Sequence, residues 1–281
     1  MDKVIQSAIE KLETVAITPF IGKICPTLCI IYKSGDKGAQ SYLRSLNRLG
    51  NKYQCTIVMR QCDKPQEVSM VITEWIHNID CNGIIILSDY GEATQALYDM
   101  IPTRLDIDGL SYKSVGRLYG SHDPLAYRKA PCTAVACLKI IQERFDNLEG
   151  LNVAVIGRSM RVGRPLAELL TQQNCTVTLY HSKSFYSNSY NNFQHADIIV
   201  SAIGKPKYWS ADNIDGIGAD FIDIGINVDE NGKVCGDGDY DSLTTVCNYV
   251  TPVPGGVGNM STIVLFAKLF ANKREMVGDA A

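Results

Sequence analysis

Short apolar runs alternate with segments of helical periodicity along almost the whole chain. Eight runs have the apolar, β-branched character of buried strands: 27–32, 55–60, 83–88, 152–157, 176–180, 197–204, 220–225 and 247–251. Between several of them lie helical patterns, at 39–50, 67–79 and 133–145 and from Pro165 onward. Strands that are apolar on both faces and alternate with helices are typical of parallel sheets covered by helices on both sides. The sequence therefore predicts an α/β protein.

The length and the apolar content allow two domains, each with its own core. The chain has 281 residues, of which 46% are hydrophobic. We predict an N-terminal, three-layer α/β domain formed by residues 1–120 and 253–281, with a Rossmann-type dinucleotide-binding domain formed by residues 121–252. The polar, glycine-rich stretch 227–239 predicts a hairpin or arm. We expect the helical pattern at 259–273 to pack back on the N-terminal domain.

The charge and the cysteine pattern exclude several classes of partner. The net charge is −3 without runs of like charge, which disfavours nucleic acid and anionic membranes as partners. Residues 1–16 have the pattern of an amphipathic helix with mixed charges and lack the apolar core of a signal peptide. The ten scattered cysteines and four histidines show no metal-ligand spacing. We therefore expect a cytoplasmic protein with reduced cysteines and no metal site.

The stretch from Asn152 to Pro165 carries the clearest chemical signal. An apolar strand ends at Gly157, a basic loop follows, and a second glycine precedes Pro165 and a helix. The N-terminus of a helix offers N–H groups and a dipole to an anion. We predict that this loop binds a dinucleotide phosphate through Gly157, Arg158, Ser159, Val162, Gly163 and Arg164, with Arg161 adding charge. Its glycines depart from the G-x-G-x-x-G spacing, so an ordinary strand-to-helix turn is the alternative interpretation.

The residues after the next strand favour NADP over NAD. In dinucleotide folds, a carboxylate at the end of the second strand binds the ribose 2′-hydroxyl of NAD, whereas basic or hydroxyl groups accommodate the 2′-phosphate of NADP. Here the strand ends in His181-Ser182-Lys183-Ser184, which contains no acid. The same four residues are also consistent with a solvated loop.

These motifs, with others in order along the chain, resemble the methylenetetrahydrofolate dehydrogenase/methenyltetrahydrofolate cyclohydrolase family. The matching motifs are G-R-S-x-x-V-G-R-P at 157–165, H-S at 181–182, G-I-N at 225–227, T-P-V-P-G-G-V-G at 251–258, D-x-D-G at 106–109, V-G-R-L at 115–118 and P-C-T at 131–133. The resemblance covers nearly the whole chain.

The resemblance implies a folate enzyme that uses NADP and acts as a homodimer. Tyr42 would stack on the pterin, and Asp108 would bind its 2-amino-pyrimidine edge. Both are the expected catalytic residues. Substrate binding would also involve Pro254, Gly255 and Gly256, and cofactor binding would add His181, Ser182, Gly225, Ile226 and Asn227 to the phosphate loop.

The chain departs from the family where protons are handled. The family has a lysine four residues after the tyrosine, and here that position is Leu46. Leu87 stands where the family has a supporting glutamine, and Asp89 replaces a proline. Arg44 and Arg48 lie about 200° around the helix from position 46, and Lys33, at the end of the first strand, is a less favoured substitute. Ala134 and Ala136 replace the proline and glycine of a third motif.

We therefore predict NADP-dependent oxidation of 5,10-methylenetetrahydrofolate to 5,10-methenyltetrahydrofolate, with weak or absent hydrolysis to 10-formyltetrahydrofolate. Leucines at positions 46 and 87 cannot donate, accept or relay a proton. Two alternatives stay open. One is a non-enzymatic nucleotide- or folate-binding protein. The other is a related dehydrogenase with a different small substrate.

Overall fold

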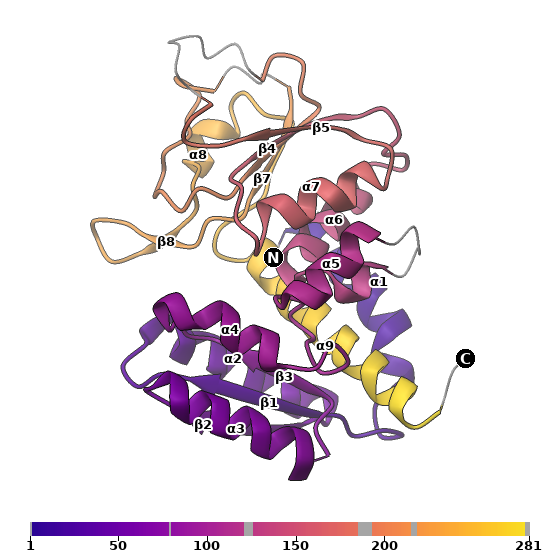
Figure 1. Cartoon of the computed structure of the whole chain (residues 1–281). Helices are drawn as coiled ribbons and strands as arrows, with labels where there is room; N and C mark the ends of the chain where they lie inside the picture. Colours follow the sequence, from indigo (N-terminus) through magenta and orange to yellow (C-terminus); the bar gives the residue numbers. More distant parts are fainter. Residues whose placement is uncertain (1, 79, 121–125, 185–192, 215–217, 279–281) are drawn as a thin grey trace. The chain divides into compact units, whose positions relative to one another are not determined.

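Two compact units divide the chain (Figure 1). The computed structural model describes residues 2–78, 80–120, 126–184, 193–214 and 218–278. The small-sheet unit contains residues 10–132 and 262–281, and the large-sheet unit contains residues 1–9 and 133–261. Each unit has its own parallel β-sheet, and a separate two-stranded ribbon completes the strands of the large-sheet unit. The predicted α/β class is confirmed.

The small-sheet unit is built on three parallel strands in the order β2-β1-β3. Their bounds are Thr27–Tyr32 for β1, Thr56–Gln61 for β2 and Gly83–Ile86 for β3. Cys29 and Ile31 of β1 pack in one buried cluster with α3 and α4. Leu28 and Ile30, which point to the opposite face because strand side chains alternate, are also fully buried. Both faces of this sheet are therefore covered, as the run of apolar residues predicted.

The helices that lie wholly in this unit are α2 (Lys37–Tyr53), α3 (Pro65–Asn78), α4 (Thr94–Met100) and α5 (Tyr112–Gly120), with 3-10 turns at Thr18–Phe20, Gly91–Ala93 and Ala126–Lys129. Helices α1 (Lys3–Ala16) and α9 (Val257–Met276) belong to it in part. Asp36 caps α2 by accepting a hydrogen bond from the Ala39 N–H at 2.9 Å. The sequence prediction did not include α4 and α5, because both are short and their apolar periodicity spans only two turns.

The large-sheet unit has five parallel strands in the order β10-β7-β6-β4-β5. The strands are β4 (Asn152–Ile156), β5 (Thr176–Tyr180), β6 (Ile198–Ser201), β7 (Asp220–Asp223) and β10 (Tyr249–Val250). The helices are α6 (Cys132–Arg144), α7 (Gly163–Thr171) and the short α8 (Tyr240–Leu243). Helix α7 packs on β4 and β5 (Figure 1). The strand order reverses beside β4, and ligands of such sheets bind at the carboxyl ends of the strands at that point.

The predicted hairpin within 227–239 is present as the antiparallel pair β8 (Asn227–Val228) and β9 (Val234–Cys235). Glycine at position 232 has a φ of 76° in the turn between them. This is the left-handed conformation that glycine adopts without a steric penalty.

The two units differ from the predicted division in three places. The start of the chain belongs to the large-sheet unit, where Asp2 accepts a hydrogen bond from the Tyr249 hydroxyl at 2.8 Å. Residues 253–261 also belong there, where the hydroxyls of Thr133 and Ser261 share a hydrogen bond at 3.3 Å. The described residues between 121 and 132 belong to the small-sheet unit, where the Ala130 carbonyl accepts from Lys268 of α9.

Two buried aspartates hold the carboxyl edge of the large sheet together. Asp223, at the end of β7, accepts hydrogen bonds from the N–H groups of Gly225, Asp237 and Gly238. Asp237, which is fully buried, accepts from the Ser201 hydroxyl, the Asn227 amide, and the N–H groups of Ile203 and Lys205. These bonds join the end of β6, the end of β7 and the β8–β9 hairpin.

The pKa of Asp223 makes this arrangement sensitive to pH. Burial raises this pKa to about 6, although the three N–H donors act in the opposite direction. In the unfolded chain an aspartate titrates near pH 4. Between these two values the folded protein binds more protons than the unfolded protein. The stabilisation that Asp223 contributes is therefore complete below about pH 4 and is lost as the pH rises through about 6.

We expect Asp223→Asn to lack this pH-dependent loss of stability, because an asparagine side chain does not titrate. The free energy of unfolding of the natural chain, minus that of the variant, should fall by about 2–3 kcal/mol between pH 4 and pH 7. Urea denaturation at a series of pH values measures it. Asp212→Asn, at an exposed turn of the same unit, is the control and should give a constant difference. A constant difference for Asp223→Asn as well would contradict this account.

Candidate functional site

The six-residue spacing of the two loop glycines has a steric cause. Gly157 has a φ of 123°, and a Cβ atom there would lie 2.4 Å from the Ala202 carbonyl oxygen. A Cβ atom on Gly163 would lie 1.8 Å from the Gly157 carbonyl oxygen. Each glycine therefore permits a backbone contact that no other residue allows. The first brings β4 against the end of β6, and the second brings the start of α7 against the end of β4.

Ser159 organises the loop between these glycines. Its hydroxyl accepts a hydrogen bond from the Val162 N–H at 3.1 Å, and its carbonyl accepts from the Arg164 N–H at 3.2 Å. Helix α7 starts at Gly163, so its first turn faces the loop. The side chains of Arg158, Ser159, Arg161 and Arg164 are all exposed. The loop therefore presents basic groups and a helix N-terminus at one place, which suits a phosphate.

The His181–Ser184 segment lies next to this loop. Ile156 of β4 pairs with Tyr180 of β5, and the Gly157 N–H donates to the Tyr180 carbonyl at 2.9 Å. The next residues form a tight turn in which the His181 N–H donates to the Ser184 hydroxyl at 3.0 Å. The His181 Nδ1 atom accepts from the Lys183 N–H at 3.1 Å. The turn thus leaves Ser182 and Lys183 exposed on the same edge as the phosphate loop.

The Gly225-Ile226-Asn227 motif is built around Asp237. A Cβ atom on Gly225 would lie 2.2 Å from the Asp237 Oδ1 atom, and the Asn227 amide donates to the same oxygen at 2.9 Å. Ile226 is 72% exposed, which is high for an apolar side chain of this size. Sequence reasoning did not assign Asp223 and Asp237. The available signal was an acid at the end of an apolar strand and another in a glycine-rich turn.

The Thr251–Gly256 turn is anchored at the same edge. The Thr251 hydroxyl accepts from the Asp223 N–H at 2.7 Å. A Cβ atom on Gly256 would lie 2.4 Å from the Pro252 carbonyl oxygen, so the turn closes tightly there. Gly255 has a φ of 108°, and Pro254 is exposed. These residues, assigned from sequence to substrate binding, therefore extend the edge formed by the phosphate loop.

In the small-sheet unit, Asp108 is held on a rigid turn. Asp106 is buried and its carboxylate accepts from the N–H groups of Gly109, Leu110 and Ser111 and from the Ser114 hydroxyl. A Cβ atom on Gly109, whose φ is 71°, would lie 2.4 Å from the Lys129 carbonyl oxygen. The half-buried Asp108 lies inside this turn. The backbone of Asp108 is thus fixed by the residues on either side.

Helix α2 places Tyr42 and Leu46 on one face, one turn apart. Leu46 is fully buried and Tyr42 is half-buried, whereas Arg44 and Arg48 are exposed. The expected separation of the two arginines from position 46 is confirmed. A lysine at position 46 would require a site that the fully buried leucine now fills.

Leu87 and Lys33 lie at the carboxyl edge of the small sheet. The Leu87 N–H donates to the Ile31 carbonyl at 2.9 Å, and its side chain is half-buried. The Lys33 ammonium donates to the Asp89 carbonyl at 2.5 Å and lies 4.4 Å from the centre of the Tyr90 ring. Lys33 is thus engaged by residues of the altered 87–91 loop.

Asp36 has a structural role at this edge. The Ala39 N–H and the Ser88 hydroxyl donate to its carboxylate, and these bonds hold its pKa below the usual range. Because both bonds fix the start of α2, this carboxylate positions the helix that carries Tyr42.

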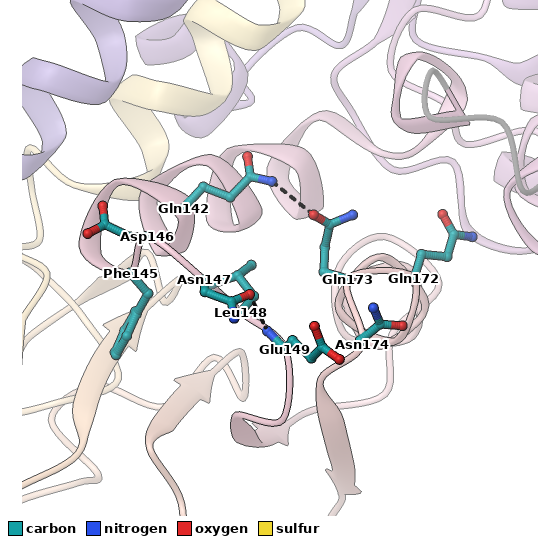
Figure 2. A pocket seen from close by; sticks show the side chains of 9 residues that line it. All are labelled: Gln142, Phe145, Asp146, Asn147, Leu148, Glu149, Gln172, Gln173 and Asn174. Atoms are coloured by element: carbon teal, nitrogen blue, oxygen red, sulfur yellow. Dashed lines mark hydrogen bonds between the residues drawn. The ribbon is translucent and has the colours of Figure 1, made fainter.

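A pocket of about 450 Å³ opens elsewhere on the large-sheet unit (Figure 2). It lies before the first residues of β4 and β5, at the amino edge of the sheet. Gln142 donates to Gln173 across it at 3.3 Å, and Asp146 and Glu149 supply negative charge. None of its nine lining residues is basic. The pocket therefore does not suit a phosphate.

Within the described residues, no three His, Cys, Asp or Glu side chains are grouped to hold a metal ion. All ten cysteines are free. No helix in the described part of the chain has the length and apolar character needed to cross a bilayer.

Comparisons with known proteins match this chain over most of its length. Residues 131–276 match the family model described as the NAD(P)-binding domain of tetrahydrofolate dehydrogenase/cyclohydrolase. The bifunctional protein FolD of Campylobacter concisus is 35% identical over 85% of this chain and 84% of its own length. FolD of Staphylococcus epidermidis is 35% identical over 88% and 86%. The structure of the Campylobacter jejuni FolD dehydrogenase/cyclohydrolase has a TM-score of 0.84 at 25% identity, with 96% of each chain covered. The chain therefore belongs to the tetrahydrofolate dehydrogenase/cyclohydrolase family.

Proposed function

We propose that this protein oxidises 5,10-methylenetetrahydrofolate to 5,10-methenyltetrahydrofolate with NADP. The observation that carries the proposal is the carboxyl edge of the large sheet. There, the phosphate loop, the His181–Ser184 turn and the Gly225–Asn227 motif are held together by backbone contacts that only glycine permits and by the buried aspartates. The family model that covers this unit is described as NAD(P)-binding.

The residues present fit a dinucleotide at this edge. Gly157 and Gly163 leave the space that a Cβ atom would fill, and the exposed Arg158 and Arg164 supply charge for a pyrophosphate. When bound, the nicotinamide would accept the hydride, and the protein would supply binding and alignment.

Asp108 and Tyr42 are the proposed substrate residues of the small-sheet unit. The Asp108 carboxylate would accept hydrogen bonds from the paired N–H donors of the pterin edge, in the manner of a carboxylate and a guanidinium. Tyr42 would contribute an aromatic face. The two residues are held in different ways. Hydrogen bonds to the Asp106 carboxylate fix the turn that carries Asp108, whereas Tyr42 lies on helix α2, which Asp36 caps.

The preference for NADP should depend on Lys183. We expect Lys183→Ala to raise the KM for NADP about tenfold, because one charge-assisted hydrogen bond to the 2′-phosphate is lost. The KM for NAD should change less than twofold. Lys233→Ala, at the exposed tip of the hairpin, is the matched control. Initial rates with both cofactors measure these values, and equal changes for NADP and NAD would count against the assignment.

Cyclohydrolase activity should be weak or absent because Leu46 and Leu87 carry no exchangeable proton. We expect 5,10-methenyltetrahydrofolate to disappear at nearly the buffer-only rate when the natural chain is added. The double variant Leu46→Lys/Leu87→Gln should hydrolyse it faster than the natural chain, and Leu46→Met should not. Hydrolysis by the natural chain far above the buffer rate would refute the prediction.

A non-enzymatic folate- or nucleotide-binding protein is the second candidate. The observation in its favour is the paired presence of leucines at 46 and 87, together with the full burial of Leu46. NADPH formation from 5,10-methylenetetrahydrofolate separates the two candidates. Binding without turnover would favour the second candidate.

We further propose a cytoplasmic homodimer whose partners are a tetrahydrofolate derivative and a second copy of the chain. The family resemblance supports the dimer. The ten free cysteines are compatible with a reducing compartment. The net charge of −3 gives no support to nucleic acid as a partner.

A further inference from the structure

A buried lysine lies beside the Asp108 turn. Lys268 is on α9 and is 5% exposed, and it is the one lysine that is buried in the described part of the chain. Lysines are almost never buried to this extent unless their ammonium is paired, since removing the charge from water is costly. The environment of this ammonium therefore indicates what the residue does.

The Lys268 ammonium donates to two backbone carbonyls. One is that of Ile107, at 3.2 Å, and the other is that of Ala130. Ile107 directly precedes Asp108, and Ala130 lies in the segment that packs against Gly109. A single charged group thus ties the Asp108 turn to the 129–132 segment. Hydrogen bonds to a charged donor are stronger than those between neutral groups.

The thiol of Cys132 completes the cluster. It donates to the same Ile107 carbonyl at 3.2 Å, and it interacts with both the Lys268 ammonium and the Asp108 carboxylate. Burial raises the pKa of this thiol to about 12, so it stays neutral and acts as a donor. The Asp108 carboxylate is therefore coupled to a buried cation through one sulfur atom and one peptide unit.

We propose that Lys268 is a positioning residue for Asp108, and that it sets the affinity for the folate substrate. The proposal rests on the proposed function. The ammonium fixes the peptide before Asp108, and it thereby orients the carboxylate that would meet the donor-rich edge of a pterin. It is not a replacement for a proton-handling lysine, because its protons are engaged by Ile107, Ala130 and Cys132.

The structure offers a matched control one turn along the same helix. Asn272 is also buried, and its amide donates to the carbonyls of Asn82 and Arg104, at 3.1 and 2.7 Å. Asn272→Met therefore removes a buried side chain that ties two backbone carbonyls, as Lys268→Met does. Asn272→Met keeps the hydrogen bond from Lys268 to the Ile107 carbonyl, directly before Asp108.

We expect Lys268→Met to raise the KM for 5,10-methylenetetrahydrofolate about tenfold to a hundredfold, the loss expected for a hydrogen bond to a charged group. The KM for NADP should stay within twofold, and kcat should change less than the folate KM. Asn272→Met should lower the thermal midpoint without raising the folate KM. If Lys268→Met does not fold, Lys268→Gln serves instead, because its amide keeps a donor but lacks the charge.

A double-mutant cycle with Asp108→Asn separates positioning from a general structural role. If Lys268 acts through Asp108, Lys268→Met should change the folate KM little in the Asp108→Asn background. The proposal would be overturned if the two substitutions had additive effects on the folate KM, or if Lys268→Met left that KM unchanged. A natural chain that forms no NADPH would contradict the proposed function instead. The natural chain and the same variants would then be compared by calorimetric titration with folic acid. Equal affinities of the natural chain and Lys268→Met would overturn the role assigned to Lys268.

Discussion

The carboxyl edge of the large sheet depends on two buried carboxylates, Asp223 and Asp237, whose hydrogen-bond donors in the described part of the chain are backbone, amide and hydroxyl groups. Seven hydrogen bonds from N–H, amide and hydroxyl donors converge on Asp223 and Asp237, and they join segments that lie up to 36 residues apart in the chain. Backbone donors satisfy these acids in place of cations, which leaves the arginines of the phosphate loop exposed to solvent. The fold thus separates the negative groups that build the edge from the positive groups that can receive a phosphate.

Much of this architecture could be predicted from the sequence because local patterns and global fold agree. Fully apolar strands such as 27–32 and 152–156 are buried on both faces, and the glycine-rich stretch near 232 forms a hairpin. The predicted passage from a strand through a loop to a helix is present at 152–171, in spite of the irregular glycine spacing. The geometry of the loop explains the spacing, since Gly163 is needed for contact with the Gly157 carbonyl rather than for the usual turn.

Other features could not be predicted because they depend on contacts between distant segments. The roles of Asp223 and Asp237 appear only when the ends of β6 and β7 lie next to the hairpin. The bounds of the two units likewise depend on contacts between distant segments, such as the hydrogen bond from Tyr249 to Asp2. The roles proposed for Tyr42, Asp108 and the cofactor residues stay predictions. The geometry supplies a suitable setting for each, and binding of folate or NADP is the measurement that tests it.

The small-sheet unit places its charged groups differently from what the family motif suggests. Where a lysine is expected, Leu46 is fully buried, and this part of helix α2 gains stability from burial instead of carrying an amine. A buried ammonium is present at Lys268, but carbonyl oxygens hold it beside the turn that carries Asp108. A charge held in this way is placed to orient the neighbouring turn. On the proposed function, this unit would hold a folate while the hydride leaves and would lack a group that activates water against it.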